Sequence, residues 1–274
     1  MPGGDNLTNP IHGLVTRRDL VSDLRKLGVE PGQTLLVHAS IRSIGLVDGG
    51  AAAVVGALRE AVGRTGNVVV PTGTAENSVT SRAHKALIAQ MTDDEVRAFR
   101  RSMPGFDKDA TPSTTGALGE ALRTVAGAER SAHPQSSFAA IGPQAGYLMA
   151  DHRFDCHLGE YSPLAKLYKM KASILLLGVG YQACSAFHLA EYRYVASPPN
   201  TIYSCAVIMN GRRQWIAYMD VVLDDRDFGQ IGKSLDDDIE AFVKKGNVGS
   251  ALSRLIPMVQ AVDHARDWMA EHRV

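Results

Sequence analysis

The first regular pattern of apolar and polar positions lies between residues 16 and 27. Its leucines recur at the three- and four-residue spacing of one helix face. Thr16 and Asp19 form a Thr-x-x-Asp capping signature at the start of this segment. The pattern therefore predicts a helix with its apolar face turned toward a core.

Two short apolar runs follow, QTLLVHAS (residues 33–40) and NVVVPT (residues 67–72). Their length and continuous apolar character are typical of strands that are buried on both faces. Between them lies a segment with helical spacing, for which Asp48 is the expected cap. Its apolar residues are Val54, Val55, Leu58, Ala61 and Val62. Strand, helix and strand in this order predict a βαβ unit with parallel strands.

Residues 74–109 are polar and contain one clear helix start, formed by Thr92 and Glu95. A polar insertion between a strand end and the next core element is expected to form a substrate loop. The segments beyond it return to the α/β pattern. Helices are expected at 113–125, from Pro143, from Ser162–Pro163 and at 183–194, and strands at 138–141 and 173–179.

The pattern changes after Pro199, where two β-rich runs flank Asn210–Gly211, a strong hairpin signal. The remainder is expected to be helical, with Ser234 and Asp237 capping one helix and Trp268 on the last. The prediction is a single α/β domain over residues 1–274. It has a central, mostly parallel sheet flanked by helices, a β-hairpin excursion near residues 201–223 and a helical C-terminus.

Composition narrows the function classes. The 274 residues carry 29 basic and 29 acidic side chains, so the formal net charge is zero, which argues against a general nucleic-acid binder. No apolar run approaches the roughly 18–20 residues that span a bilayer, and the N-terminus lacks an apolar signal core. Three scattered cysteines do not form a disulfide framework. We expect a cytoplasmic protein without nucleic-acid or membrane partners.

Two motifs resemble cofactor or metal sites. GVGYQA (residues 178–183) mimics a dinucleotide-binding fingerprint, but no acidic residue follows at the expected distance, so a tight strand-to-helix turn is the better interpretation. His152, Asp155, Cys156 and His157 are close in sequence without a zinc-ligand spacing. We expect a polar loop there, and no metal.

His188 follows the 173–179 strand on a predicted helix, and Glu191 stands three positions later, so both side chains project from one helix face. A carboxylate beside an imidazole raises its basicity and fixes its tautomer, as a general base requires. A packed histidine with a surface ion pair is the alternative. The carboxyl end of a parallel strand is also where open α/β sheets place their chemistry.

Three loops are rich in small and hydroxyl residues: HASIRSIG (38–45), TPSTTG (111–116) and SAHPQSSFAAIG (131–142). Such loops suit phosphate or pantetheine contacts through backbone N–H groups, especially where they lead into a helix. Together they indicate an anionic, extended ligand such as a nucleotide-bearing cofactor.

In this order, these segments resemble the aminoglycoside 3-N-acetyltransferase family. The matching stretches are LLVHASIRSIGLVDGG, GNVVVPTGT, MPGFDKDATPSTTGALGEALRTVAGAERSAHPQSSFAAIG, GEYSPLAKLY and ILLLGVGYQACSAFHLAEYR. The resemblance implies an α/β fold distinct from the GNAT acetyltransferases. It also implies acetyl-coenzyme A as the donor and acetyl transfer to an amine in a ternary complex.

Carried onto this sequence, the resemblance makes His188 the catalytic base, with Glu191 orienting the imidazole or gathering the cationic acceptor. For His38, a cofactor contact and a packed position are both open. The residues expected to bind coenzyme A are His38, Ser40, Arg42, Ser43, Thr72, Ser113, Ser136, Ser137 and Phe138.

The acceptor side departs from the family pattern. Many members carry an aromatic residue and an aspartate after the strand that corresponds to NVVVPT, whereas here the loop reads GTAENSVTS, with Glu76 only approximately in place. Acidic residues for a cationic acceptor are expected from Glu76, Asp155, Glu160 and Glu191. The leading hypothesis is transfer to the 3-amino group of a 2-deoxystreptamine antibiotic, conferring resistance. The alternatives are another amine metabolite, in biosynthesis or self-protection, or a catalytically silent binding protein; a monomer and a homodimer are both open.

Overall fold

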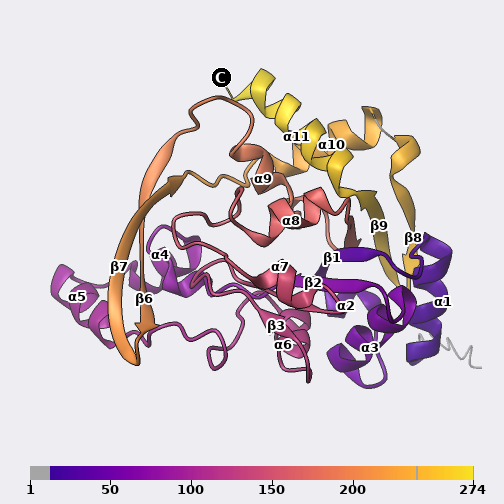
Figure 1. The fold of residues 1–274 in the computed structure, drawn as a ribbon, viewed down its shortest axis with the longest axis horizontal. Coiled ribbons are helices and arrows are strands. Elements are labelled where there is room, and N and C mark those ends of the chain that lie inside the picture. The colour runs from indigo at the N-terminus through magenta and orange to yellow at the C-terminus, as the bar shows by residue number, and fades with distance from the viewer. Residues whose placement is uncertain (1–12, 239, 274) are drawn as a thin grey trace, which may run out of the picture.

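The computed structural model describes residues 13–238 and 240–273 (Figure 1). The strands are β1 (Thr34–Ala39), β2 (Asn67–Pro71), β3 (Glu129–Arg130), β4 (Phe138–Ile141), β5 (Ser173–Leu177), β6 (Asn200–Met209), β7 (Arg212–Val221), β8 (Lys244–Val248) and β9 (Ala251–Pro257). The helices are α1 (Arg17–Leu27), α2 (Ile41–Ile44), α3 (Gly50–Val62), α4 (Arg82–Ile88), α5 (Asp93–Ser102), α6 (Ala117–Arg123), α7 (Ala145–Met149), α8 (Pro163–Lys169), α9 (Phe187–Glu191), α10 (Phe228–Asp238) and α11 (Met258–His272). Short 3-10 turns are η1 (Ala75–Asn77), η2 (Tyr181–Ala183) and η3 (Glu240–Phe242).

Seven strands form one mixed sheet in the order β3-β4-β2-β1-β5-β9-β8. At its centre, β1 pairs in parallel with both β2 and β5, as the βαβ pattern predicts. The neighbours on either side, β4 and β9, are antiparallel to β2 and β5. The predicted α/β class with a parallel centre is thus confirmed, and the carboxyl ends of three strands meet at one edge.

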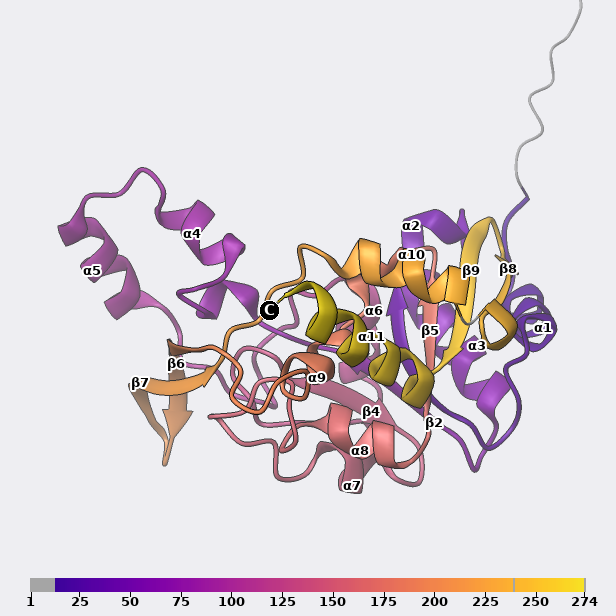
Figure 2. The ribbon, with the colours of Figure 1, turned by 90° about the horizontal axis from the view of Figure 1, so that it is seen from above.

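Helices cover both faces of this sheet (Figures 1 and 2). On β1, Leu35 and Val37 pack with α1, α3 and α6, whereas Leu36 packs on the opposite face with α8, α9 and α11. Because successive side chains of a strand point to opposite faces, a strand covered on both sides must be apolar at every position. That requirement explains the uninterrupted apolar run seen in the sequence.

The local start signals are largely confirmed. Thr16 with Asp19 and Thr92 with Glu95 form reciprocal capping boxes at α1 and α5, and Ser162 caps α8 with proline at its start. Three expectations need correction. The predicted cap Asp48 does not cap α3, which begins after Gly49 in a left-handed turn. The 113–125 helix is limited to α6. The 183–194 helix is limited to the short α9, and the 3-10 turn η2 precedes it.

The C-terminal part also differs from the expectation of helix alone. Ser234 and Asp237 lie inside α10 rather than at its start, and a β8–β9 hairpin separates α10 from α11. β9 pairs with β5 and extends the sheet, so its apolar residues are buried by the long-range partner rather than marked by local periodicity. Trp268 lies on the final helix, α11, as predicted.

The predicted β-hairpin forms a separate two-stranded sheet, with β6 and β7 paired antiparallel along their length. Asn210 and Gly211 adopt φ values of 51° and 71°, the left-handed conformation that a tight primed turn needs. In Figure 1 the hairpin lies at one end of the molecule, beside α4 and α5.

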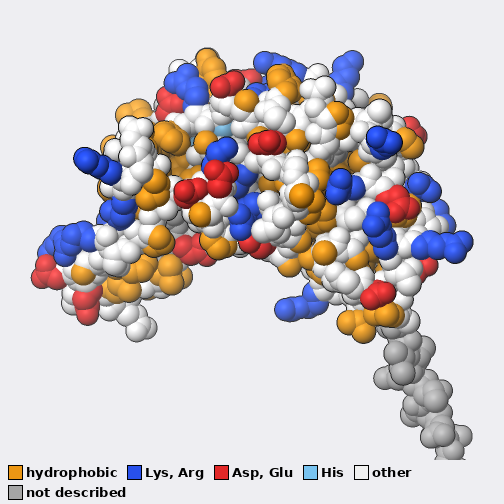
Figure 3. Space-filling model, turned by 60° about the horizontal axis from the view of Figure 1, so that its bottom comes forward, with side chains coloured by type: hydrophobic (Ala, Val, Ile, Leu, Met, Phe, Trp, Pro, Cys, Tyr) orange, Lys and Arg blue, Asp and Glu red, His pale blue; other side chains and the backbone are white. Residues whose placement is uncertain are grey.

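The 74–109 insertion forms an arm that contains η1, α4 and α5 and projects from the body (Figure 2). Two contacts fasten it to β6. The Asn77 side chain donates to the Ala206 carbonyl at 2.8 Å and accepts from the Ala206 N–H at 2.9 Å, and Phe106 forms a bridge with Val207. Figure 3 shows the outline of the molecule hollowed between this arm and the sheet body. In the described part of the chain, no helix combines the length and apolar character required to cross a membrane.

Candidate active site

His188 and Glu191 lie on the short helix α9, and their side chains are within ion-pair distance of each other. The Nδ1 atom of His188 lies 2.7 Å from Oε2 of Glu191. The Glu191 side chain is 1% exposed and that of His188 is 16% exposed. The carboxylate is therefore behind the ring, and the ring is the member of the pair that reaches solvent.

The second oxygen of Glu191 is also held. Oε1 accepts hydrogen bonds from the Asp224 backbone N–H at 2.8 Å and from Nη1 of Arg273 at 2.7 Å. The His188 ring packs against Phe228, with 4.7 Å between the ring centroids. Because Nδ1 donates to a fixed carboxylate, Nε2 is the ring nitrogen that remains for a substrate.

His188 lines a cleft of about 570 Å³ between the arm, the hairpin and the sheet. The cleft includes residues of α4, the loop before β4, the start of β6 and the loop before α10. Its polar lining residues are Ser78, Thr80, Ser81, Arg82, Lys85, Gln135, Ser136, His157, His188, Thr201, Tyr203 and Asp225. A cleft of this size and polarity suits a hydrophilic small molecule.

A second cavity, of about 280 Å³, opens at the carboxyl ends of β1 and β2 and includes His38, Thr115 and Ser185. Val179 and Ala183 line both this cavity and a third of about 510 Å³. The third cavity continues to Ser43, Gly178, Ser250 and Arg254. The two adjoining cavities trace an extended path along the sheet edge to the neighbourhood of His188.

His38 stands where this path approaches the cleft. Its Nε2 atom lies 3.2 Å from the Ser185 hydroxyl. Burial, together with the neighbouring His188, lowers the pKa of His38 to about 4. His38 is therefore neutral at pH 7. It is available as a hydrogen-bond partner where the second cavity approaches the cleft that His188 lines.

The residues expected to bind coenzyme A occupy different environments. Ser43 lines the path, its hydroxyl lies 2.8 Å from that of Ser40, and Arg42 stands between them on α2. Ser136 lines the cleft beside His188, where its hydroxyl donates to the His157 carbonyl at 2.9 Å.

Ser40 and Arg42 are not among the lining residues, and four others do not line these spaces either. The Thr72 and Ser137 side chains are buried and lie 3.2 Å apart, and Phe138 is 1% exposed in the core of β4. The Ser113 hydroxyl lies 2.9 Å from that of Thr115, which does line the second cavity. Because the side chains of Thr72, Ser137 and Phe138 are buried, their contacts support the fold.

Of the acidic residues expected around the acceptor, only Glu191 contacts His188. Asp155 pairs with Arg153, at 2.8 Å and 2.6 Å, and Glu160 pairs with Arg193 at 2.6 Å. Glu76 lies on η1 next to the cleft residue Ala75, but it is absent from the lining.

The charged residues that do line the cleft are different. Arg82 and Lys85 project from α4, and Arg82 pairs with Asp225. The described lining therefore carries two cations and one carboxylate besides the imidazoles.

A buried network behind the cleft was not foreseen. His157 Nδ1 donates to Asp220 at 2.6 Å, and Tyr192 donates to the same carboxylate oxygen at 2.8 Å. Burial lowers the pKa of His157 in spite of this carboxylate, and also that of His133. The sequence marks the histidines of this region, but Asp220 is 63 positions away from His157, so no local spacing connects the pair.

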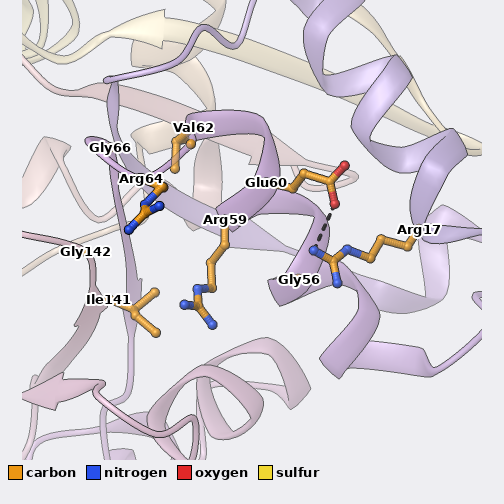
Figure 4. Close-up of a pocket in the computed structure, with 10 residues that line it drawn as sticks. Arg17, Gly56, Arg59, Glu60, Val62, Arg64, Gly66, Ile141 and Gly142 are labelled. Atoms are coloured by element: carbon orange, nitrogen blue, oxygen red, sulfur yellow. Dashed lines mark ion pairs between the residues drawn. The ribbon is translucent and has the colours of Figure 1, made fainter.

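A further cavity, of about 520 Å³, lies at the opposite end of the parallel strands, where Gly66 precedes β2 (Figure 4). Figure 4 shows Arg59 and Arg64 extending into it, while Arg17 reaches Glu60 at 2.9 Å. Arginines near the C-terminal end of a helix are favourable to its dipole, which accounts for two of them. This cavity is separate from the His188 edge of the sheet.

Comparison with known families supports the resemblance seen in the sequence. The family model described as Aminoglycoside 3-N-acetyltransferase matches residues 36–270. An aminoglycoside N(3')-acetyltransferase-like protein of Bacillus subtilis, YokD, is 35% identical over 257 residues, covering 92% of each chain. Aminoglycoside N(3)-acetyltransferase VII of Streptomyces paromomycinus is 33% identical over 274 residues, covering 94% of this chain and 93% of the relative.

Solved structures of similar fold have names that belong to the same group of proteins. The crystal structure of YokD from Bacillus subtilis has a TM-score of 0.88 at 33% identity and covers 95% of both chains. AAC-VIa bound to sisomicin has a TM-score of 0.80 at 32% identity, covering 96% of this chain and 100% of that one. AAC-IIIb in a binary complex with CoASH has a TM-score of 0.81 at 25% identity, covering 94% and 97%. With the family model, the relatives and the solved structures in agreement, the chain belongs to the aminoglycoside 3-N-acetyltransferase family.

Proposed function

We propose that this protein transfers the acetyl group of acetyl-coenzyme A to an amine of an aminoglycoside, the 3-amino group of 2-deoxystreptamine, and thereby confers resistance. His188 is the proposed general base. The observation that carries this proposal is the position of the His188–Glu191 pair, where the cavities along the sheet edge approach the larger cleft. The names of the relatives add the acetyl transfer and the acceptor class.

The chemistry follows from the free ring nitrogen. As the acceptor nitrogen forms a bond with the thioester carbon, it loses a proton to Nε2 of His188, and Glu191 stabilises the resulting imidazolium. The carbon–sulfur bond then breaks, and the proton is returned to the departing sulfur, which yields the amide and free coenzyme A. Base catalysis of this kind contributes about 10²–10⁴-fold to the rate.

We propose that the donor lies along the sheet edge, in the cavities that run from Ser43 and Arg254 toward His38. A backbone-rich, elongated path fits pantetheine, which has alternating amide groups, and Arg42 or Arg254 supplies a cation for a phosphate. The complex of AAC-IIIb with CoASH supports coenzyme A as a ligand of this fold.

The acceptor side favours a second candidate, a primary amine that is not an aminoglycoside. Aminoglycosides are polycations, for which a cleft with several carboxylates is the complementary surface. Here Arg82 and Lys85 enter the cleft, and Asp225 is already paired with Arg82. An amine that also carries a carboxylate or phosphate would match this lining.

Release of free thiol from acetyl-coenzyme A separates these possibilities. We expect turnover that depends on a kanamycin- or gentamicin-type amine, and the second candidate predicts faster turnover with amines that carry an anionic group. Arg82→Ala combined with Lys85→Ala would improve aminoglycoside turnover and weaken turnover of anionic amines. Thermal stabilisation by the ligands with no thiol release for any amine would instead indicate a silent binding protein.

A further inference from the structure

Arg273 follows the last residue of α11 and reaches back to the pair on α9. Its Nη1 atom donates to Glu191 at 2.7 Å, and its Nε and Nη2 atoms donate to the two oxygens of Asp227 at 2.6 Å and 2.5 Å. Nη2 also donates to the Asp224 carbonyl at 2.6 Å. One guanidinium thus links α9, the loop before α10 and the end of α11. It lies outside the 36–270 segment that the family model matches.

This contact is shielded from solvent. The side chains of Arg273, Asp227 and Glu191 are 16%, 21% and 1% exposed. Burial by itself would lower the pKa of Arg273, but its hydrogen bonds to Asp227 and Glu191 outweigh burial and raise it above its ordinary value. The guanidinium therefore carries a permanent positive charge against the carboxylate that holds His188.

The net charge of this cluster depends on whether His188 is protonated. With His188 neutral, two carboxylates and one guanidinium leave one net negative charge in this cluster. When His188 accepts a proton, the imidazolium brings the cluster to zero net charge. A partly buried group of charges is most stable when it is balanced, so the arrangement favours the protonated state that forms during acetyl transfer.

We propose that Arg273 and Asp227 are positioning residues for the His188–Glu191 pair. Arg273 fixes the Glu191 carboxylate so that Oε2 faces the imidazole, and Asp227 balances the arginine so that its charge does not cancel that of Glu191. Neither residue is among those that line the cleft or the two sheet-edge cavities. This inference rests on the proposed function for its catalytic consequence, while its structural part concerns the free protein.

Other charged and titratable groups face the pair. His38 approaches from β1, His157 from the loop before α8 and Tyr203 from β6. Asp224 lies beside the arginine, and its carboxylate binds Arg226, which lowers the pKa of Asp224 to about 2. That pair is neutral as a unit, so it leaves the balance among His188, Glu191, Asp227 and Arg273 unchanged.

Arg273→Ala, Asp227→Asn and the matched control Arg266→Ala test the proposal. Arg266 lies on the same helix, α11, and pairs only with Asp263 and Asp267 among the described residues. We expect Arg273→Ala to lower kcat by about 10- to 100-fold through loss of orientation, with KM for acetyl-coenzyme A within about twofold. Millimolar guanidinium would restore part of kcat. Asp227→Asn would move the acid limb of kcat/KM to lower pH, because the imidazolium loses a stabilising charge.

Proton NMR of the free protein gives a readout that needs no turnover. The hydrogen-bonded Nδ1 proton of His188 should resonate far downfield in wild type and in Arg266→Ala, and should shift or broaden in Arg273→Ala. If wild type turns over no amine, the proposed function fails, yet this signal still tests the link from Arg273 to His188.

The proposal is overturned if Arg273→Ala keeps wild-type kcat and an unchanged His188 signal. It is also overturned if lost activity follows lost thermal stability and guanidinium does not restore it. Should Arg273→Ala not fold, Arg273→Lys replaces it. An ammonium cannot reproduce the fork that reaches both carboxylates, so kcat should fall at unchanged thermal stability, and a wild-type kcat would contradict the proposal.

Discussion

His188 has its Nδ1 atom occupied by Glu191 and its ring in the lining of the cleft, so it combines a fixed tautomer with access to a bound molecule. His188→Ala removes the base but leaves the sheet-edge path for the donor intact. We expect kcat to fall by at least about 100-fold, with little change in coenzyme A affinity measured by calorimetry. The exposed His272, changed to alanine, serves as the control. A His188→Ala enzyme with near-normal turnover would exclude the proposed role.

The sequence contains the parts of this site that local spacing encodes. His188 and Glu191 are one helical turn apart, and Ser43 and Ser136 follow from loop composition. Arg273 is 82 positions from Glu191, and no periodicity connects them. Asp155 and Glu160 are expected near the acceptor for their charge, and in the structure they pair with Arg153 and Arg193.

Among the elements, two capping boxes have the same chemistry but different surroundings. Thr16 begins α1, whose leucines are buried in the core, whereas Thr92 begins α5, which has no buried residue. Loss of an N-cap costs about 1 kcal/mol. Thr16→Ala should therefore lower the free energy of unfolding by about that amount, measured with urea.

Thr92→Ala should instead speed hydrogen exchange within α5 and leave global unfolding nearly unchanged, because local opening of a projecting helix does not require the core to open. Equal losses of global stability in both variants would contradict this distinction.

The difference between local signals and long-range pairing explains which elements the sequence predicts. The central strands are marked by uninterrupted apolar runs, and the β6–β7 turn by Asn210–Gly211. β8 reads KKGNV, which is too polar for a buried strand, and it pairs only because it lies at the edge of the sheet next to β9. β9 is held in the sheet by β5, which lies far away in the sequence, and such long-range pairing carries no local signature. The prediction of a purely helical C-terminus is therefore wrong for β8 and β9.

For the whole molecule, buried histidines make stability depend on pH. Burial lowers the pKa of His38 to about 4 and that of His152 to about 3, below the ordinary value of 6.5. Unfolding exposes these rings, so below pH 6.5 the unfolded chain binds more protons than the folded one. The free energy of unfolding therefore has its full value above pH 6.5. It declines between pH 6.5 and pH 4, by roughly 1.4 kcal/mol per pH unit for each ring that stays neutral in the folded protein.

Urea unfolding at pH 7.5, 6.0 and 5.0 measures this decline. His38→Gln, which removes one of the titrating rings, should give a shallower dependence on pH over that interval. A free energy of unfolding that does not change between pH 7 and pH 5 would contradict the assignment of these histidines as neutral and buried.

The attachment of the arm has a consequence for how acceptor preference changes over evolution. Arg82 and Lys85 belong to a segment fastened to the β6–β7 hairpin through Asn77 and Phe106, whereas the proposed donor path is formed by the sheet edge. The arm supplies six of the residues that line the cleft, and none of the residues that line the two sheet-edge cavities. If the cleft takes the acceptor as proposed, recombination or drift within residues 74–109 changes part of the acceptor lining and leaves the proposed donor path unaltered.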